Sequence, residues 1–202
     1  MCVVCPSWLS FILYNPLRKI LTDREKVLEE FGVNHDSVVL EVGAGNGFFT
    51  EVLAARAKKV YSVELQRGMV GKLRRRVAGL GDKVSIIECD ISACGIWNGL
   101  ADVCLMYYSF HEVKDKIGAV RAISRALKDG GLLSLYEPTV EVSADKMRGT
   151  VEMFENAGFK KEAERNGLFT RFQKLRKFDA EALPTSSTDS LVPGKAPRDF
   201  PG

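Results

Sequence analysis

The stretch VVLEVGAGNGFFTEVL, residues 38–53, decides the fold of this chain. It begins as a short apolar run with one acid, Glu41, near its end, continues through glycines at every second position, and then takes up a helical pattern. Such a run predicts a strand buried on both faces, and glycines in the next turn let the backbone approach a ligand closely. The stretch therefore predicts the first strand, turn and helix of a nucleotide-binding α/β fold.

The same alternation of strand and helix patterns continues along the chain. Further apolar runs stand at residues 60–63, 84–87, 103–107 and 132–136, and helical patterns at 23–31, 48–57, 66–78, 114–127 and 145–157. This alternation predicts a parallel sheet covered by helices on both faces. Two polar segments, 159–165 and 169–176, carry too much charge for a buried central strand and predict an antiparallel edge pair. The expected fold is α/β, a doubly wound, mostly parallel seven-stranded sheet with that pair at its edge.

Three regions follow from these patterns. Residues 1–32 are expected to form an N-terminal helical segment that acts as a lid, residues 33–178 the ligand-binding domain, and residues 179–202 a disordered tail. The tail is rich in Pro, Ser, Thr and Gly and has little to bury. Simple packing is the alternative to a lid for the first segment.

Composition narrows the function classes. A formal charge of +3 is too mild to indicate a nucleic-acid-binding protein by itself. The apolar residues 8–14 stop at Asn15-Pro16, short of the about 20 that a membrane span needs, so we expect a cytoplasmic protein without a span or signal peptide. The five cysteines are odd in number and scattered, which predicts reduced thiols. Cys2 and Cys5 have metal-site spacing, but no second pair completes a site, so no metal is expected.

The acids at the predicted strand ends discriminate between nucleotide ligands. The glycine spacing is G-x-G-x-G, whereas a dinucleotide site wants G-x-G-x-x-G. Glu41 beside that loop would repel a pyrophosphate but suits an ammonium or sulfonium group. Glu64, about 20 residues beyond the loop, is placed to accept two ribose hydroxyls, and Asp90 can accept an exocyclic adenine amine. The pattern describes an adenosine with a positively charged amino-acid arm.

With these motifs in this order, the chain resembles the class I S-adenosylmethionine-dependent methyltransferases. ADVCLMYYSFHEV, residues 101–113, is similar to the family's fourth-strand segment, and ALKDGGLLSLYEP, residues 126–138, to its helix, Gly-Gly turn and fifth strand. The resemblance implies a Rossmann-like methyltransferase fold with S-adenosyl-L-methionine as cofactor. The cofactor-binding residues that it implies are Glu41, Gly43, Ala44, Gly45, Gly47, Glu64, Leu65, Asp90, Ile91 and Tyr107.

More narrowly, residues 15–33 with the FHEV and YEP motifs look like the small-molecule branch that includes ubiquinone/menaquinone biosynthesis C-methyltransferases and arsenite methyltransferases. The cysteine pattern of the arsenite enzymes finds no match, which makes arsenic a doubtful substrate. The Asn/Asp-Pro-Pro-Tyr motif of amino-methylating enzymes is missing after strand four, where residues 107–111 read YYSFH. Amide or exocyclic-amine methylation is therefore disfavoured.

The residues after the fourth strand are the candidates for chemistry. Either His111 or Glu112 could act as a general base or orient the acceptor. In the plainer interpretation Glu112 caps the next helix or sits in its first turn, and His111 packs against it. The substrate pocket is expected to take aromatic and charged residues from three parts of the chain, namely Tyr14, Arg18, Tyr108, Phe110 and Glu137.

The leading hypothesis is a methyltransferase that acts by in-line displacement on a small-molecule acceptor. Two alternatives stay open. The basic residues 72–76 could dock RNA or a protein substrate, although such a run is more often a solvated helix face, which disfavours nucleic acid. A non-catalytic chain could instead keep the cofactor pocket as a sensor or scaffold. The sequence specifies neither the acceptor nor the oligomeric state.

Overall fold

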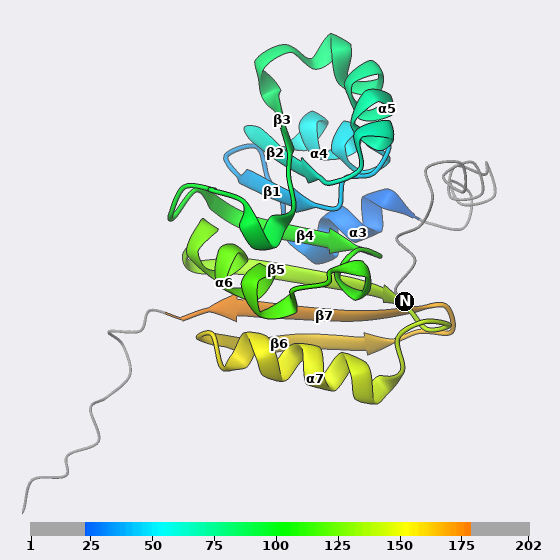
Figure 1. Ribbon diagram of the computed structural model, residues 1–202, viewed down its shortest axis with the longest axis vertical. Coiled ribbons are helices and arrows are strands. Elements are labelled where there is room, and N and C mark those ends of the chain that lie inside the picture. Colours follow the sequence, from blue (N-terminus) through cyan, green and yellow to red (C-terminus); the bar gives the residue numbers. More distant parts are fainter. Residues whose placement is uncertain (1–22, 179–202) are drawn as a thin grey trace, which may run out of the picture.

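The computed structural model describes residues 23–178, and these form one seven-stranded sheet. The strand order is β3-β2-β1-β4-β5-β7-β6 (Figure 1). The strands are β1 (Val38–Val42), β2 (Lys59–Glu64), β3 (Val84–Glu88), β4 (Ala101–Tyr107), β5 (Leu127–Pro138), β6 (Phe159–Asn166) and β7 (Thr170–Lys177). β1 to β5 pair in parallel, and β7 pairs antiparallel with both β5 and β6. The expected doubly wound sheet with an antiparallel edge pair is confirmed.

Helices cover both faces of this sheet. The α-helices are α3 (Arg24–Phe31), α4 (Thr50–Arg56), α5 (Arg67–Val77), α6 (Lys116–Ala126) and α7 (Ala144–Glu155). Short 3₁₀ turns are η1 (Ala78–Lys83), η2 (Ile91–Ala93) and η3 (Phe110–Glu112). Figure 1 shows α6 and α7 over one face and α3 and α4 over the other. The N-cap residues of α3, α6 and α7 are Asp23, Asp115 and Ser143, and the side chain of each accepts a hydrogen bond from a backbone N–H in the first turn.

The period of two in the strands divides the core between the two faces. Leu40 and Met106 pack with the residues of α6 and α7, while Val39 and Leu105 pack with those of α3 and α4. Strands sandwiched in this way are apolar on both faces, which explains the continuous apolar runs in the sequence.

Two details of the sheet refine the sequence expectation. β5 starts at Leu127 rather than at residue 132, because Leu127 already pairs with Ala101 and the register then shifts around Gly130 and Gly131. Gly130 has φ 75°, a left-handed conformation that a glycine adopts without strain. Within the antiparallel pair, β7 lies between β5 and β6, so β6 is the outermost strand at this end of the sheet. The charged residues of β7 are tolerated because most of them are only half-buried.

The strand order reverses direction between β1 and β4. From β1 the chain moves outward to β2 and β3, and then returns to the other side of β1 as β4 and β5. Loops that leave neighbouring strands on opposite sides open a crevice at the carboxyl ends, where ligands of such folds bind. No helix within residues 23–178 is long and apolar enough to cross a membrane.

Several expectations concern residues outside the described ones. They are the part of the lid segment up to residue 22, with Tyr14, Arg18 and the Cys2–Cys5 pair, and the tail from residue 179.

Candidate functional site

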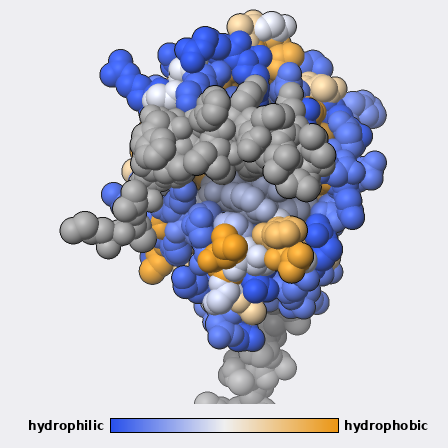
Figure 2. Space-filling model, turned by 90° about the vertical axis from the view of Figure 1, so that its right-hand side faces the viewer, coloured by the Kyte–Doolittle hydropathy of each residue, from blue (hydrophilic) through white to orange (hydrophobic). Residues whose placement is uncertain are grey.

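A cavity of about 610 Å³ opens at the carboxyl ends of β1 to β5. Figure 2 looks onto this side of the molecule, where a few separate hydrophobic patches lie on a mostly polar face. Most of the predicted site residues line the cavity, namely Glu41, Gly43, Ala44, Gly45, Glu64, Leu65, Asp90, Ile91, Tyr107, Tyr108, His111 and Glu112. The fold thus brings strand-end residues that are far apart in the sequence into one site.

The three glycines of the loop after β1 serve different purposes. All have positive φ, at 76°, 57° and 84° for Gly43, Gly45 and Gly47. A Cβ on Gly43 would lie 2.3 Å from the Cβ of Ser109, and one on Gly47 would lie 2.8 Å from Leu73 Cδ1. A Cβ on Gly45 would meet no atom within 4 Å. Gly45 therefore presents bare backbone to the cavity, whereas Gly43 and Gly47 allow close packing, and Gly47 itself does not line the cavity.

Glu41 is a buried carboxylate held by two hydroxyls. Its Oε2 accepts hydrogen bonds from Thr50 Oγ1 at 2.6 Å and Ser62 Oγ at 2.9 Å. Burial raises the pKa of Glu41 to about 7, although both hydroxyl bonds oppose the rise. A cation in the cavity would favour the ionised form. Thr50 and Ser62 were not among the predicted site residues, although a serine inside the apolar run of residues 60–63 was a signal for Ser62.

Glu64 fixes the glycine loop against the start of α5. Its Oε2 accepts the Gly45 N–H and its Oε1 accepts the Gln66 N–H, both at 2.7 Å. Burial raises the pKa of Glu64, and these backbone bonds lower it in part. A carboxylate has about four acceptor positions, so both oxygens keep capacity for hydroxyl donors from a ligand. Leu65, next in the chain, is 53% exposed and offers an apolar surface beside them.

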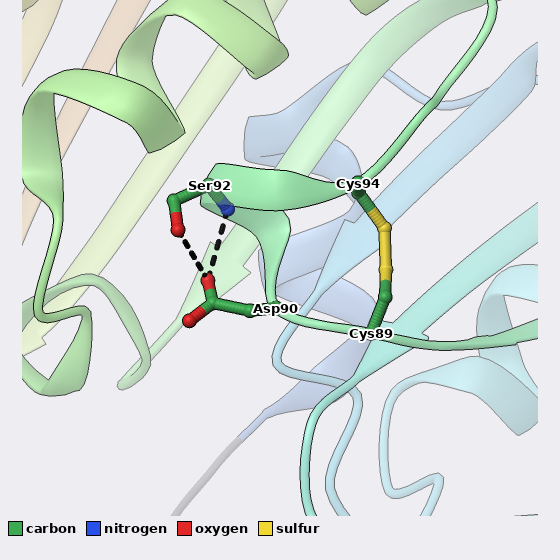
Figure 3. The surroundings of a disulfide bond; sticks show 4 residues. All are labelled: Cys89, Asp90, Ser92 and Cys94. Atoms are coloured by element: carbon green, nitrogen blue, oxygen red, sulfur yellow. Dashed lines mark hydrogen bonds between the residues drawn. A yellow bond between two sulfur atoms is a disulfide. The ribbon is translucent and has the colours of Figure 1, made fainter.

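Asp90 caps the short turn η2, and a disulfide closes the same turn. Asp90 Oδ1 accepts hydrogen bonds from the Ser92 N–H at 2.9 Å and Ser92 Oγ at 2.8 Å, and Asp90 lines the cavity. Figure 3 shows the Cys89–Cys94 disulfide on one side of the turn and the Asp90 carboxylate on the other. This bond corrects the expectation of reduced thiols, since the two Cα atoms lie only 5.9 Å apart, a distance that a disulfide spans. Cys104 is a buried free thiol.

The end of β4 closes the cavity on its other side. Tyr108 has φ 57°, a strained value for a residue with a Cβ, and its N–H bonds Tyr136 O at 2.7 Å. This turn brings Ser109 onto Gly43, where Ser109 Oγ donates to Val42 O at 2.8 Å. The Tyr107 ring lies 4.4 Å from Phe49 and from Tyr108, between centroids. A strained residue at a cavity wall is a common feature of functional sites.

His111 lies between two carboxylates at the mouth of the cavity. Its Nδ1 bonds Glu137 Oε2, and its Nε2 lies 3.0 Å from Glu141 Oε2. Burial lowers the pKa of His111, but the bond and the charge of Glu137, followed by Glu141 and Glu112, raise it by more. Both carboxylates therefore favour the protonated form of the ring. Glu141 also lines the cavity and was not among the predicted residues.

Two of the predicted substrate-pocket residues do not face the cavity. Phe110 is 1% exposed and packs against Phe154, with ring centroids 5.5 Å apart. Glu137 is also 1% exposed, because it points to the same face of β5 as Leu135 and lies behind His111. Glu112 is half-buried at the cavity, where burial raises its pKa. It does not cap the next helix, since Asp115 does so.

Residues 23–178 contain no group of three or more His, Cys, Asp or Glu side chains placed to hold a metal ion.

Comparison with known proteins agrees with this geometry. Residues 40–135 match the family model described as "Methyltransferase domain". An uncharacterized methyltransferase of Geobacillus sp. (strain WCH70) is 33% identical over 115 residues, which are 56% of this chain and 53% of that protein. A ribosomal RNA small subunit methyltransferase A of Koribacter versatilis is 40% identical over 76 residues, 38% of this chain and 26% of that protein. The chain thus spans about half, or less, of these curated relatives.

Solved structures show the same fold. A SAM-dependent methyltransferase from Aquifex aeolicus superposes with a TM-score of 0.76 at 24% identity, covering 86% of this chain and 99% of that one. A putative S-adenosyl-L-methionine-dependent methyltransferase from Methanococcus maripaludis gives a TM-score of 0.72 at 18% identity, covering 88% and 92%. The seven-stranded sheet is that of Rossmann-like methyltransferases. The family match and the fold together imply S-adenosyl-L-methionine as the cofactor.

Proposed function

We propose that this chain, which carries a methyltransferase domain with the Rossmann-like methyltransferase fold, is a methyltransferase that transfers a methyl group from S-adenosyl-L-methionine to a small-molecule acceptor. One observation carries the proposal. The carboxylates of Glu41, Glu64 and Asp90 converge with the bare backbone of Gly45 on a single cavity. A pyrophosphate-binding dinucleotide site does not need acids at three successive strand ends around its glycine loop.

The cavity has groups that fit each part of the cofactor. Glu41 is a buried carboxylate with a raised pKa, and a cationic ammonium beside it would favour its charged form. Glu64 keeps acceptor capacity for ribose hydroxyls beside its two backbone bonds. Asp90 Oδ2 and the Ile91 side chain would meet the adenine, with exposed Leu65 covering its face. When bound, the cofactor supplies an electrophilic methyl group on a sulfonium.

Charge and size favour a small acceptor over a polyanion. The cavity lies within the range of roughly 300–1,000 Å³ that small-molecule and cofactor sites occupy. Among residues 23–178, its lining includes Glu41, Glu64, Asp90, Glu112 and Glu141, with Lys114 as the only lysine or arginine. Such a lining repels a phosphate backbone. Tyr107 and Tyr108 supply aromatic walls on the acceptor side. Tyr14 and Arg18 stay proposals for a lid, and the cytoplasmic location stays a prediction.

A second candidate is methylation of RNA. The match to ribosomal RNA methyltransferase A, at 40% identity over 76 residues, favours it. The acidic lining and the YYSFH sequence after β4, in place of an amino-methylating motif, argue against it. A salt titration of binding to total RNA separates the two candidates, since phosphate contacts give affinities that fall steeply with salt. A sensor without catalysis would bind the cofactor alike but turn over no acceptor.

Isothermal calorimetry tests the cofactor directly. We expect S-adenosylmethionine and S-adenosylhomocysteine to bind the full chain and NAD to give no heat. Glu64→Ala should lose at least tenfold in affinity for both sulfur compounds. Glu88→Ala is the matched control, because Glu88 ends the neighbouring strand opposite Glu64 but does not line the cavity. Absence of binding by both sulfur compounds would contradict the proposal.

A further inference from the structure

His111 is fixed from behind by a buried carboxylate. Glu137 is 1% exposed, and its Oε1 accepts the Phe110 N–H at 2.9 Å while its Oε2 bonds His111 Nδ1. Lys116 Nζ ties down the same turn by donating to the carbonyl oxygens of Phe110 at 3.2 Å, His111 at 3.3 Å and Val113 at 2.8 Å. Position and tautomer of the imidazole are therefore set by β5 and α6, and the chemistry left to the ring lies at Nε2.

The carboxylate beside His111 Nε2 belongs to Glu141, which is exposed, whereas Glu137 beside Nδ1 is buried. The Glu141 side chain is 60% exposed, stands in the turn after β5, and lines the cavity. Its backbone is held by the Glu141 N–H bond to Pro138 O at 3.2 Å and by Lys146 Nζ on Glu141 O at 3.2 Å. The Glu141 side chain thus contacts His111 Nε2 through Oε2, while most of it is exposed to solvent. A group of this kind can accept a proton at the ring and release it to water.

We propose that Glu137 and Glu141 are positioning residues that make His111 a proton acceptor for the methyl acceptor, with Glu137 fixing Nδ1 and Glu141 exchanging the Nε2 proton with solvent. This inference rests on the proposed methyltransferase function and narrows its substrate class. The acceptor must be protic, carrying an O–H, N–H or S–H bond whose proton can reach Nε2. An acceptor whose nucleophilic atom is already a deprotonated anion has no proton to transfer, so His111 would not speed its methylation in this way.

The protons balance over one cycle. Glu141 takes the Nε2 proton and turns to solvent, where water removes it, and His111 is left neutral with an Nε2 lone pair. The acceptor X–H then forms the X–CH₃ bond as the S–CH₃ bond breaks with its electron pair on sulfur, and its proton goes to Nε2. The products are X–CH₃, a neutral thioether and an imidazolium, which meets the Glu141 carboxylate again and restores the starting state.

The charged groups around His111 explain why a relay is needed. Glu137 from β5, Glu141 from the following turn and Glu112 from η3 all favour the charged ring, and Lys116 from α6 bonds the backbone of the turn. These charges favour the protonated ring, and a protonated ring must release a proton before it can act as a base. Removing the negative charge of Glu141 should lower the pKa of His111, because one of three favourable charges is lost.

NMR titration of the two imidazole rings tests the proposal without a known acceptor. The chain has two histidines, and His35 precedes β1 with a side chain 88% exposed, so its signal is an internal reference. In ¹⁵N-labelled full chain we expect Glu141→Gln to shift the His111 midpoint to lower pH. Glu155→Gln removes the same charge from the far end of α7 and should leave the midpoint in place. A Glu141→Gln midpoint equal to that of Glu155→Gln would overturn the relay.

Glu137→Gln adds a second readout. It should lower the His111 midpoint further and change the ¹⁵N shift pattern that reports the tautomer. If the amide oxygen introduced by Glu137→Gln accepts the Phe110 N–H, its NH₂ group faces Nδ1 and cannot accept a hydrogen bond from it. An unchanged tautomer pattern in a folded variant would contradict the role of Glu137. Calorimetry with S-adenosylhomocysteine runs in parallel on each variant. If the variants bind S-adenosylhomocysteine but their His111 titration is the same as in the wild type, only the relay is refuted. If the wild type does not bind S-adenosylhomocysteine, the proposed function is refuted.

Discussion

At the scale of single residues, Glu41 couples stability to function. Burial raises its pKa from 4.5 in the unfolded chain to about 7 in the folded chain. Between these values the folded chain holds a proton that the unfolded chain has released, so stability falls as pH rises from about 4.5 through 7. Glu41→Gln removes that loss and should stabilise the ligand-free protein at pH 8 by up to roughly 3 kcal/mol, with little effect at pH 4.5.

Urea unfolding at pH 5 and pH 8 measures this difference. Glu29→Gln is the control, since Glu29 lies exposed on α3. The gain of Glu41→Gln over wild type should grow with pH, while that of Glu29→Gln should stay flat. The same variant should bind S-adenosylhomocysteine more weakly, because an amide carries no charge for the ammonium. A stability gain that does not change with pH would show that Glu41 is not the titrating group.

Gly43 gives a second prediction, based on its contact with Ser109. A Cβ at Gly43 would lie 2.3 Å from Ser109 Cβ and would also sit at φ 76°. Gly43→Ala should destabilise the protein by about 2–4 kcal/mol, the left-handed backbone costing ~1–3 kcal/mol and the clash adding to it. Ser109→Gly removes the clash but leaves the strain, so the double variant should recover part of the loss. Denaturant unfolding of the four proteins in this cycle checks it, and strict additivity would contradict the contact.

The same residues show how far single positions can be predicted. Glu41, Glu64 and Asp90 were found because parallel strands end at one edge, so acids at their ends converge. Glu137 was misplaced although it also ends a strand. Glu137 lies two residues after Leu135 in β5, so both side chains point to the face of the sheet that α6 covers. The sequence does not show that His111 contacts Glu137 on that face. Glu141 lies in a turn, where no period assigns a direction to its side chain.

At the scale of elements, the turn η2 depends on one cross-link. The disulfide joins Cys89 to Cys94 around Asp90 and closes a short loop, with a sequence separation of 5. Loop-closure entropy for so short a loop predicts a stabilisation of roughly 2 kcal/mol. Reduction, or Cys94→Ser, should therefore lower the free energy of unfolding by about that amount and weaken S-adenosylhomocysteine binding several-fold, because Asp90 is no longer held toward the adenine.

A background of Cys2→Ser and Cys5→Ser isolates this effect, and buried Cys104 stays in place. In the Cys2→Ser, Cys5→Ser protein with Cys94 intact, tris(carboxyethyl)phosphine should lower both the free energy of unfolding and the affinity for S-adenosylhomocysteine. The Cys94→Ser variant should show the lower values from the start and no response to reductant. Equal affinity with and without reductant would mean that the disulfide does not order the adenine side.

Most of the elements could be predicted from the sequence, and the reasons for the differences are local. Buried parallel strands leave continuous apolar runs, so β1 to β4 begin and end within two residues of the expectation. The start of β5 was placed too late, since Lys128 to Gly131 read as a turn although they bulge within a continuing strand. The 3₁₀ turns η2 and η3 are three residues long, too short for any period to show, and yet they hold Asp90 and His111 in place.

At the scale of the whole molecule, folding and cofactor binding should respond to pH together. The sheet brings Glu41 of β1, Glu64 of β2 and Asp90 after β3 to one cavity, so a ligand that contacts all three joins separate parts of the chain. A ligand at about 100 times its dissociation constant stabilises a protein by about 2.7 kcal/mol. For a domain of this size that corresponds to a rise of roughly 5–10 °C in the melting temperature.

We expect S-adenosylhomocysteine to give such a rise at pH 8 and a smaller one at pH 6. With a pKa of about 7, Glu41 is mostly protonated at pH 6 and must lose its proton to pair with the ammonium. That cost corresponds to about tenfold in affinity, or about 1.4 kcal/mol. Differential scanning calorimetry at fixed ligand concentration measures both rises, and NAD should give neither. In Glu41→Gln the rise should be smaller and alike at the two pH values, because no buried carboxylate remains to titrate. An equally strong pH dependence in that variant would place the titrating group elsewhere, with Glu64 the next to test because burial raises its pKa too.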